Sequence, residues 1–319
     1  MMLRTTTRSC FLLCLTALSL SRIRAIEAQT AVVFGATGAV GNAVFRALLA
    51  QKQPIFTKVI LVGRRPFPPE VIAPVTSWAE LPLEVIKVED IVDLGNVDQH
   101  AELAAMDADA CFLAVGNAFP QRSDLHDWHR VDVTMAAAMT RLCGKMQATT
   151  ITVFTAIDAD QPDPEPYSAE ELTKTKTPLG WWPVLLGTMR MMGVKETAVV
   201  SAVTKMMMTT TTQIPPLVRI FQPSNIITKE LRYGWLDWTV FKFHAVFDPW
   251  LPTRYHSVTT ELLADAMVTD AINILSGSTA ASATTTVGEV GADGATRFTY
   301  GDFVRIVAGE NVGEELAEL

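Results

Sequence analysis

The chain has 319 residues, a formal net charge of −8 and an isoelectric point near 5.2. This length can bury a substantial core, and the acidic balance without an evident basic face argues against a general nucleic-acid-binding protein. Cys10 and Cys14 lie near the N-terminus, and Cys111 and Cys143 lie far apart in predicted core elements, so neither a disulfide framework nor a metal-ligand spacing is indicated.

Residues 1–28 have the composition of a targeting leader that stands apart from the fold. Arg4 and Arg8 precede an apolar run over 10–20. This run is shorter than the roughly 20 residues of a transmembrane helix, so no stable membrane span is expected. It matches the apolar region of a secretory signal, whereas Arg22 and Arg24 fit a mitochondrial presequence better. We expect an organellar or secretory protein that loses this leader, or a cytoplasmic one if the start codon is misassigned.

A glycine-rich turn between a strand and a helix is the most informative pattern. The apolar run 31–34 leads into Gly35, Gly38 and Gly41, and an amphipathic run follows. The first glycine permits a tight turn, the second lets backbone N–H groups approach a pyrophosphate, and the third lets the helix pack close to the strand. The pattern predicts dinucleotide binding, the alternative being a structural turn in another α/β unit. The residues of this predicted site are Gly35, Thr37, Gly38, Ala39, Val40 and Gly41.

The end of the next predicted strand indicates which dinucleotide binds. Residues 58–62 have strand character, and Arg64 and Arg65 follow directly after Gly63. An NAD-preferring site usually has an acidic residue there for the ribose 2′-hydroxyl, whereas guanidinium groups suit a 2′-phosphate. We therefore predict NADP(H) as the cofactor, and a solvated basic turn is the alternative.

Alternating strands and helices predict an α/β fold with a doubly wound parallel sheet, the Rossmann fold. Further strands are expected at 85–88, 110–115 and 151–154, with a helix at about 124–147. Ligands lie outside the carboxyl ends of such strands, so the residues at those ends should border one crevice. They are Gly35, Arg64, Asp90, Gly116 and Thr155.

Two histidines and two aspartates stand at the start of the helix predicted at 124–147. Asp124, His126, Asp127 and His129 are possible metal ligands by type. Their pattern fits an acidic, solvated helix start better, and no metal site is predicted.

Residues from about 30 to 276 resemble atypical short-chain dehydrogenases/reductases, and among them the Tat-interacting protein 2-like oxidoreductases. The glycine motif with the double arginine is the most specific part of the likeness. The segments that carry it are Val33–Gly38, Val62–Arg65, Val88–Asp90, Ala114–Gly116, Thr155–Asp160, Val194–Lys195, Leu236–Thr239 and His256–Val258. The resemblance implies that Asp90 or Ile91 meets the adenine, and that Ala114, Val115 and Gly116 line the cofactor near its centre.

The resemblance ends at the catalytic residues. The family uses a Tyr-x-x-x-Lys motif on the helix after the fifth strand, in which the tyrosine exchanges the carbonyl proton and the lysine binds the nicotinamide ribose. Here Lys195 matches the lysine, but Met191 stands at the tyrosine position, and a thioether cannot donate a proton. The hydroxyl at the end of the fifth strand is reduced to Thr155. Lys195 and Thr155 are therefore the candidate catalytic residues.

Other departures concern the second half of the chain. The Arg-Pro pair usual after the sixth strand is assigned to Lys242-Phe243, with that strand near Trp238. Tyr167 or Tyr233 would replace the missing tyrosine only through an unusual fold-back.

The predicted organisation is a leader over 1–28, a Rossmann domain over 29–276 and a small C-terminal substrate or interaction region. The domain carries insertions at 160–188 and 205–225, and residues 277–319 form a linker, a strand and a short helix. Two functions stay open. One is a reductase of a small carbonyl substrate with altered catalytic residues, and the other is a catalytically silent NADP(H)-dependent sensor or scaffold with a protein partner.

Overall fold

A mostly parallel eight-stranded sheet organises the protein, with the strand order β3-β2-β1-β4-β5-β6-β10-β9. The computed structural model describes residues 29–51, 55–67, 83–89, 91, 93–117, 120–159, 164–174, 178–209, 214–228, 246–277 and 287–309. The strands of this sheet are β1 (Gln29–Phe34), β2 (Phe56–Val62), β3 (Glu84–Val88), β4 (Ala110–Leu113), β5 (Thr150–Phe154), β6 (Leu217–Phe221), β9 (Glu289–Val290) and β10 (Thr296–Phe298). Neighbouring strands pair in parallel except β9, which pairs antiparallel with β10.

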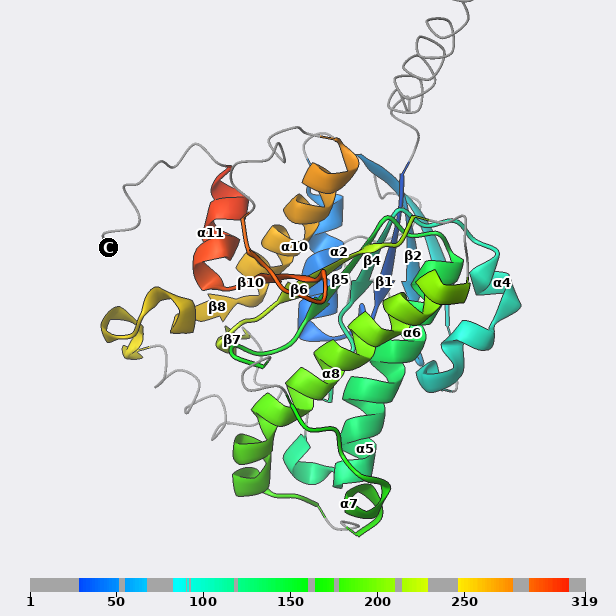
Figure 1. Cartoon of the computed structure of the whole chain (residues 1–319). Helices are drawn as coiled ribbons and strands as arrows, with labels where there is room; N and C mark the ends of the chain where they lie inside the picture. Colours follow the sequence, from blue (N-terminus) through cyan, green and yellow to red (C-terminus); the bar gives the residue numbers. More distant parts are fainter. Residues whose placement is uncertain are drawn as a thin grey trace, which may run out of the picture.

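The central strands are apolar runs because helices cover both faces of the sheet. Residues 31–34 of β1 and 110–112 of β4 are fully buried, as strands in doubly covered parallel sheets are. Figure 1 shows α2 (Ala39–Leu49) and α10 (Thr260–Leu275) on one face, and α6 (Met135–Lys145) and α8 (Trp181–Thr209) on the other. The doubly wound fold expected from the sequence is therefore confirmed.

The helix predicted at 124–147 is present but interrupted. It consists of α5 (Leu125–His129), a π-helical turn η4 (Arg130–Thr134) and α6. Its core-facing stripe of Met135, Met139 and Leu142 is fully buried, and Val131 is half-buried. A single π turn inside a helix often lies at a functional site. In this π turn the Asp132 side chain is buried in the protein interior.

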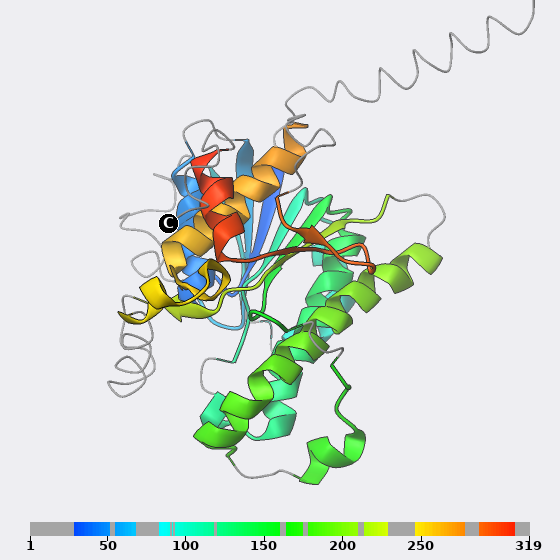
Figure 2. The ribbon, with the colours of Figure 1, turned by 60° about the vertical axis from the view of Figure 1, so that its left-hand side comes forward.

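Part of the 29–276 unit extends past the carboxyl ends of the strands. This lobe contains α5, the N-terminal half of α8 and α7 (Ala169–Lys174) (Figures 1 and 2). Residues 181–188, placed in an insertion from the sequence, are the start of the 29-residue helix α8. The side chains of Trp181 and Trp182 lie outside the described residues.

The sixth strand differs from its expected place. The strand that pairs with β5 is β6, within the segment assigned to an insertion at 205–225, and Gln222 and Pro223 follow it directly. The stretch around Trp238, together with Lys242 and Phe243, lies outside the described residues.

The C-terminal strand and helix join the main domain. Strand β10 pairs with β6, and α11 (Tyr300–Ala308) packs beside α10. Thr299 and Asp302 form a capping box at the start of α11, in which the Asp302 carboxylate accepts the Thr299 backbone N–H at 2.8 Å. A second small sheet pairs β7 (Asn225–Ile227) with β8 (Ser257–Thr259).

The remaining helices are short and connect these elements. They are α4 (Ala101–Ala104) and the 3₁₀ turns η2 (Leu94–Gln99), η3 (Pro120–Arg122), η5 (Asp248–Trp250) and η6 (Thr253–Tyr255). Among the described helices, none is both long and apolar enough to cross a bilayer. The leader at 1–28 lies outside the described residues.

Candidate functional site

The turn after β1 requires glycine at two positions. Gly35 has a φ of +78°, and a Cβ there would lie 2.7 Å from the carbonyl oxygen of Ala114. A Cβ on Gly41 would lie 2.2 Å from the carbonyl oxygen of Gly35. The first turn of α2 is thereby held against the end of β1, as the sequence motif requires.

The N-terminus of α2 can hold a phosphate. Gly38 is its N-cap and provides no side-chain cap, and the first intrahelical bond runs from the Asn42 N–H to the Gly38 carbonyl. The N–H groups of Ala39, Val40 and Gly41 therefore have no acceptor within the helix. Such groups, at the positive end of the helix dipole, fit the pyrophosphate of a dinucleotide. Thr37 lies half-buried in the same turn.

The ends of β1, β2, β3 and β4 meet at one edge of the sheet. The Gly35 N–H bonds the Val62 carbonyl, and the Gly63 N–H bonds the Val88 carbonyl. Arg64 and Arg65 follow at this edge and are both exposed, so their guanidinium groups are free to meet a phosphate in solvent. Asp90 lies outside the described residues. Its neighbour Ile91 is buried, and its N–H bonds the Gly63 carbonyl.

Lys195 lies beneath the end of β4, where the cofactor centre is expected. Its Nζ is 3.5 Å from the carbonyl oxygen of Val115 and 3.6 Å from Oδ1 of Asp132. Ala114 and Val115 are buried, whereas Gly116 is exposed. The Asp132 carboxylate also accepts the backbone N–H of Asn117 at 3.2 Å. The candidate ribose contact is thus engaged by a buried carboxylate.

Burial dominates the electrostatics of this pair. Removal from water raises the pKa of Asp132, and its attraction to Lys195 only partly opposes this shift. Removal from water also lowers the pKa of Lys195, against the attraction of Asp132 and Glu196. The two pKa values therefore move toward each other. Shifted pairs of this kind are common at functional sites, although structural ion pairs show them too.

The position of the expected tyrosine is enclosed. Met191 is fully buried in a cluster with Trp128, Val133, Val184 and Val194, which joins α5 and η4 to α8. Between Met191 and Lys195, a Cβ on Gly193 would lie 2.1 Å from the carbonyl oxygen of Ala159, so the loop after β5 crosses α8 there. Neither a proton donor nor open space is present at position 191.

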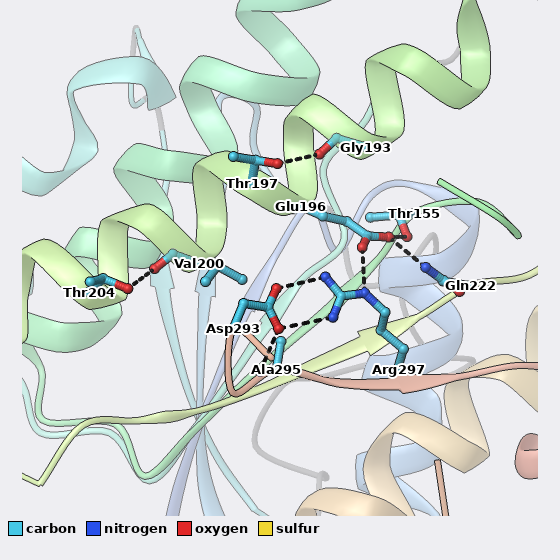
Figure 3. A network of polar contacts seen from close by, with 10 residues as sticks. All are labelled: Thr155, Gly193, Glu196, Thr197, Val200, Thr204, Gln222, Asp293, Ala295 and Arg297. Carbon is cyan, nitrogen blue, oxygen red and sulfur yellow. Dashed lines mark hydrogen bonds and ion pairs between the residues drawn. The ribbon is translucent and has the colours of Figure 1, made fainter. Parts of the chain in front are cut away.

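Thr155 is also bound to a buried carboxylate, as Figure 3 shows. Its Oγ1 donates to Oε1 of Glu196 at 2.6 Å, and Nε2 of Gln222 donates to the same oxygen at 3.0 Å. Nε of Arg297 donates to Oε2 of Glu196 at 2.9 Å. Because the hydroxyl proton of Thr155 is used inside the protein, this residue does not offer it to a carbonyl group.

Tyr167 does not replace the missing tyrosine in this structure. Its ring stacks 4.0 Å beneath the Arg190 guanidinium, edge-on to His129, and its hydroxyl lies 3.8 Å from the Cβ position of Gly187. Gly187 stands eight residues before Lys195 on α8, about 12 Å along the helix axis. Arg190 also bonds Glu171 and lowers its pKa to about 2. Tyr233 lies outside the described residues.

Two further polar groups border this end of the sheet. Asp158, in a left-handed conformation at φ 55°, accepts bonds from Arg254 and from the Tyr255 hydroxyl, the latter at 2.8 Å. Ligand atoms of Asp124, His126 and Asp127 lie within 4.8 Å of one another, but the last two residues are exposed and Asp124 caps α5.

Several residues of this site were not identified from the sequence. Asp132 lies on η4, Glu196 on α8, Gln222 directly after β6, and Arg297 on β10. Among these four residues, only Glu196 could have been noticed in the sequence, because its carboxylate directly follows Lys195 on a predicted helix.

No protein-family model and no curated protein matches the chain. Among solved structures, it is similar to Cj0485 dehydrogenase, at 13% identity and a TM-score of 0.49, over 78% of this chain and 88% of that one. It is also similar to a carbonyl reductase from Pseudomonas aeruginosa, at 15% identity and a TM-score of 0.44, over 77% and 91% of the two chains. A third, MoeE5 in complex with UDP-glucose and NAD, has 12% identity and a TM-score of 0.44 over 76% and 71%.

At such low identities and TM-scores these likenesses support no activity. The fold class follows from the strand order β3-β2-β1-β4-β5-β6 and the helices on both faces, which are those of a Rossmann domain. The fold expected from the resemblance to short-chain dehydrogenases/reductases is confirmed. The narrower likeness to Tat-interacting protein 2-like oxidoreductases stays a prediction.

Proposed function

We propose that this chain is an NADP(H)-binding protein of the atypical short-chain dehydrogenase/reductase kind. The glycine turn and the uncapped N-terminus of α2 would hold the pyrophosphate. The exposed Arg64 and Arg65 would bind the 2′-phosphate, because guanidinium groups match it in charge and geometry. Ala114, Val115 and Gly116 would line the cofactor centre, and Lys195 would face the nicotinamide ribose. When bound, the nicotinamide ring supplies hydride-transfer chemistry.

We further propose that the protein works as a cofactor-dependent sensor or scaffold rather than as an efficient reductase. The observation that carries this proposal is the enclosed Met191 at the tyrosine position. Thr155 and Lys195 are both engaged by buried carboxylates, so neither presents an unshared proton to a carbonyl substrate. Ribose binding at Lys195 would compete with Asp132 on η4, and occupancy would then be communicated to the lobe formed by α5, α7 and α8.

Reduction of a small carbonyl compound is the second candidate. The buried Asp132–Lys195 pair favours it, because the two groups lie 3.6 Å apart and burial raises the pKa of Asp132 and lowers that of Lys195, which brings the two pKa values closer together. In that case Lys195 would be the catalytic residue and Asp132 its proton partner.

Cofactor titration combined with a turnover assay separates the two candidates. The sensor proposal predicts tight NADPH binding by calorimetry. It also predicts that NADPH consumption with aldehydes, ketones and quinones is about 10²–10⁴-fold slower than in a reductase that has a general acid. Brisk turnover that disappears in Lys195→Ala would support the reductase. Brisk turnover that survives both Lys195→Ala and Thr155→Ala would place the active site elsewhere, and absent NADPH binding would contradict both candidates.

A further inference from the structure

We infer that Arg297, on the C-terminal strand β10, is a positioning residue for the cofactor site. Arg297 binds the carboxylate of Glu196 on α8, and this contact keeps α8, and with it Lys195, in place. This inference rests on the proposed NADP(H) function. Arg297 stands 101 positions after Glu196 in the chain, and the two meet through Nε and Oε2 at 2.9 Å (Figure 3).

One carboxylate connects four separate segments of the chain here. Glu196 on α8 accepts bonds from Thr155 after β5, Gln222 after β6 and Arg297 on β10. The other two nitrogens of Arg297 bind Asp293 at 3.1 and 2.8 Å, which fixes the guanidinium plane from the solvent side. The fork of Arg297 thus joins the β9–β10 hairpin to the middle of α8.

The positive charge of Arg297 compensates the buried carboxylate of Glu196. Only 2% of the Glu196 side chain and 12% of the Arg297 side chain are exposed. Burial raises the pKa of Glu196, whereas its bonds to Thr155, Gln222 and Arg297 lower it. Without Arg297, the carboxylate would keep two neutral donors and the ammonium of Lys195 on its own helix. A buried charge that loses its counter-ion takes up a proton or moves toward water.

Movement of Glu196 would displace Lys195, because the two are consecutive on one helix. Adjacent helical side chains point about 100° apart, which directs Glu196 toward β10 while Lys195 faces Asp132 and Val115. The two contacts fix the rotation of α8 about its axis. Arg297 therefore sets the place of the Lys195 ammonium without touching the cofactor.

Arg219 on β6 provides a matched comparison on the opposite face. It binds Asp270 on α10 at 2.8 and 2.5 Å and Thr296 at 2.9 Å, and it covers the ring of Phe298. Arg219 is similarly buried and paired, but these partners lie on α10 and β10 and not on α8. Loss of Arg219 should therefore cost stability without displacing Lys195.

The test compares Arg297→Met, Arg297→Lys, Arg297→Met/Glu196→Gln and the control Arg219→Met in the full chain. NADPH affinity is measured by calorimetry at about pH 7, and hydrogen exchange of the α8 peptides around Lys195 is measured without cofactor. We expect Arg297→Met to weaken NADPH binding about tenfold, or about 1.4 kcal/mol, because the buried Glu196 carboxylate then lacks its counter-ion. Exchange in α8 should rise.

The remaining variants identify the cause. Arg297→Lys should keep most of the affinity, and the double variant should recover it, because no buried charge is then unpaired. Unchanged affinity and exchange in Arg297→Met, or equal effects in Arg219→Met, would overturn the inference. If Arg297→Met does not fold, failure of the double variant to recover affinity overturns it. If the wild type binds no NADPH, the proposed function fails, and the exchange data still decide the role of Arg297.

Discussion

The ammonium nitrogen of Lys195 lies 3.6 Å from Oδ1 of Asp132, and 1% and 4% of the two side chains are exposed. One partner comes from the middle of α8 and the other from the π-helical turn η4. Each charge is compensated mainly by the other, so the stability of this region depends on both being present.

Removal of one member of this pair should be worse than removal of both. We expect Asp132→Asn and Lys195→Met each to lower the free energy of unfolding by about 3–5 kcal/mol, because each leaves a buried charge unpaired. The double variant should lose less than the sum of the two. Urea unfolding of all four proteins measures this coupling, and simple additivity would show that the two charges do not interact.

The deficit of Asp132→Asn should depend on pH. Burial lowers the pKa of Lys195 below its unfolded value, so the charged ammonium destabilises the folded state at neutral pH. This penalty disappears as the pH rises from the folded pKa toward 10.5, the ordinary pKa of lysine. Without Asp132 the folded pKa is lower still. The stability gap to wild type should therefore shrink between neutral and alkaline pH in urea titrations, and a constant gap would contradict an ionic cause.

NADPH should bind more tightly than NADH. Charge-assisted bonds from Arg64 and Arg65 to the 2′-phosphate are worth about 1.5–3 kcal/mol each before the discount for exposure, so about tenfold preference or more is expected. Calorimetric titration of wild type, Arg64→Ala/Arg65→Ala and the exposed control Arg305→Ala tests this. The preference should disappear only in the double variant, and equal wild-type affinity for the two dinucleotides would count against the assignment.

Gly41→Ala should disrupt the turn after β1. The added Cβ would lie 2.2 Å from the carbonyl oxygen of Gly35, a backbone atom that cannot move freely. We expect a loss of at least about 1–3 kcal/mol of stability and much weaker dinucleotide binding. The control is Gly301→Ala in the first turn of α11, where the nearest atom is Thr253 Cγ2 at 3.8 Å. Thermal unfolding of both variants gives the comparison, and similar melting temperatures would show that the turn yields.

Met191→Tyr should be destabilising, because position 191 is a closed core site. A tyrosine there must fit among Trp128, Val133 and Val184, at a cost of about 1–3 kcal/mol, and its hydroxyl also needs a partner. Met191→Leu keeps the volume and should cost less than about 1.5 kcal/mol. The difference is measured by thermal unfolding. A stable Met191→Tyr protein with strong NADPH-dependent carbonyl reduction would show that this pocket opens toward the cofactor.

Local sequence determined the part of the sheet around the glycine turn after β1. The turn from Gly35 to Gly41, the buried run of β1 and the stripe of Met135, Met139 and Leu142 follow from periodicity and from the steric demands of glycine, which act within a few residues. The strand ends were therefore predictable, and with them the edge of the sheet where a ligand would bind.

The tertiary structure decided which segment completes the sheet and which charges meet behind the site. β6 is short and follows a biased, threonine-rich connector, so its pairing with β5 becomes visible only in the folded chain. Asp132 meets Lys195 from 63 residues away, and Arg297 meets Glu196 across 101 residues. Such contacts have no local signature, because they depend on how helices and strands pack rather than on the propensities of neighbouring residues.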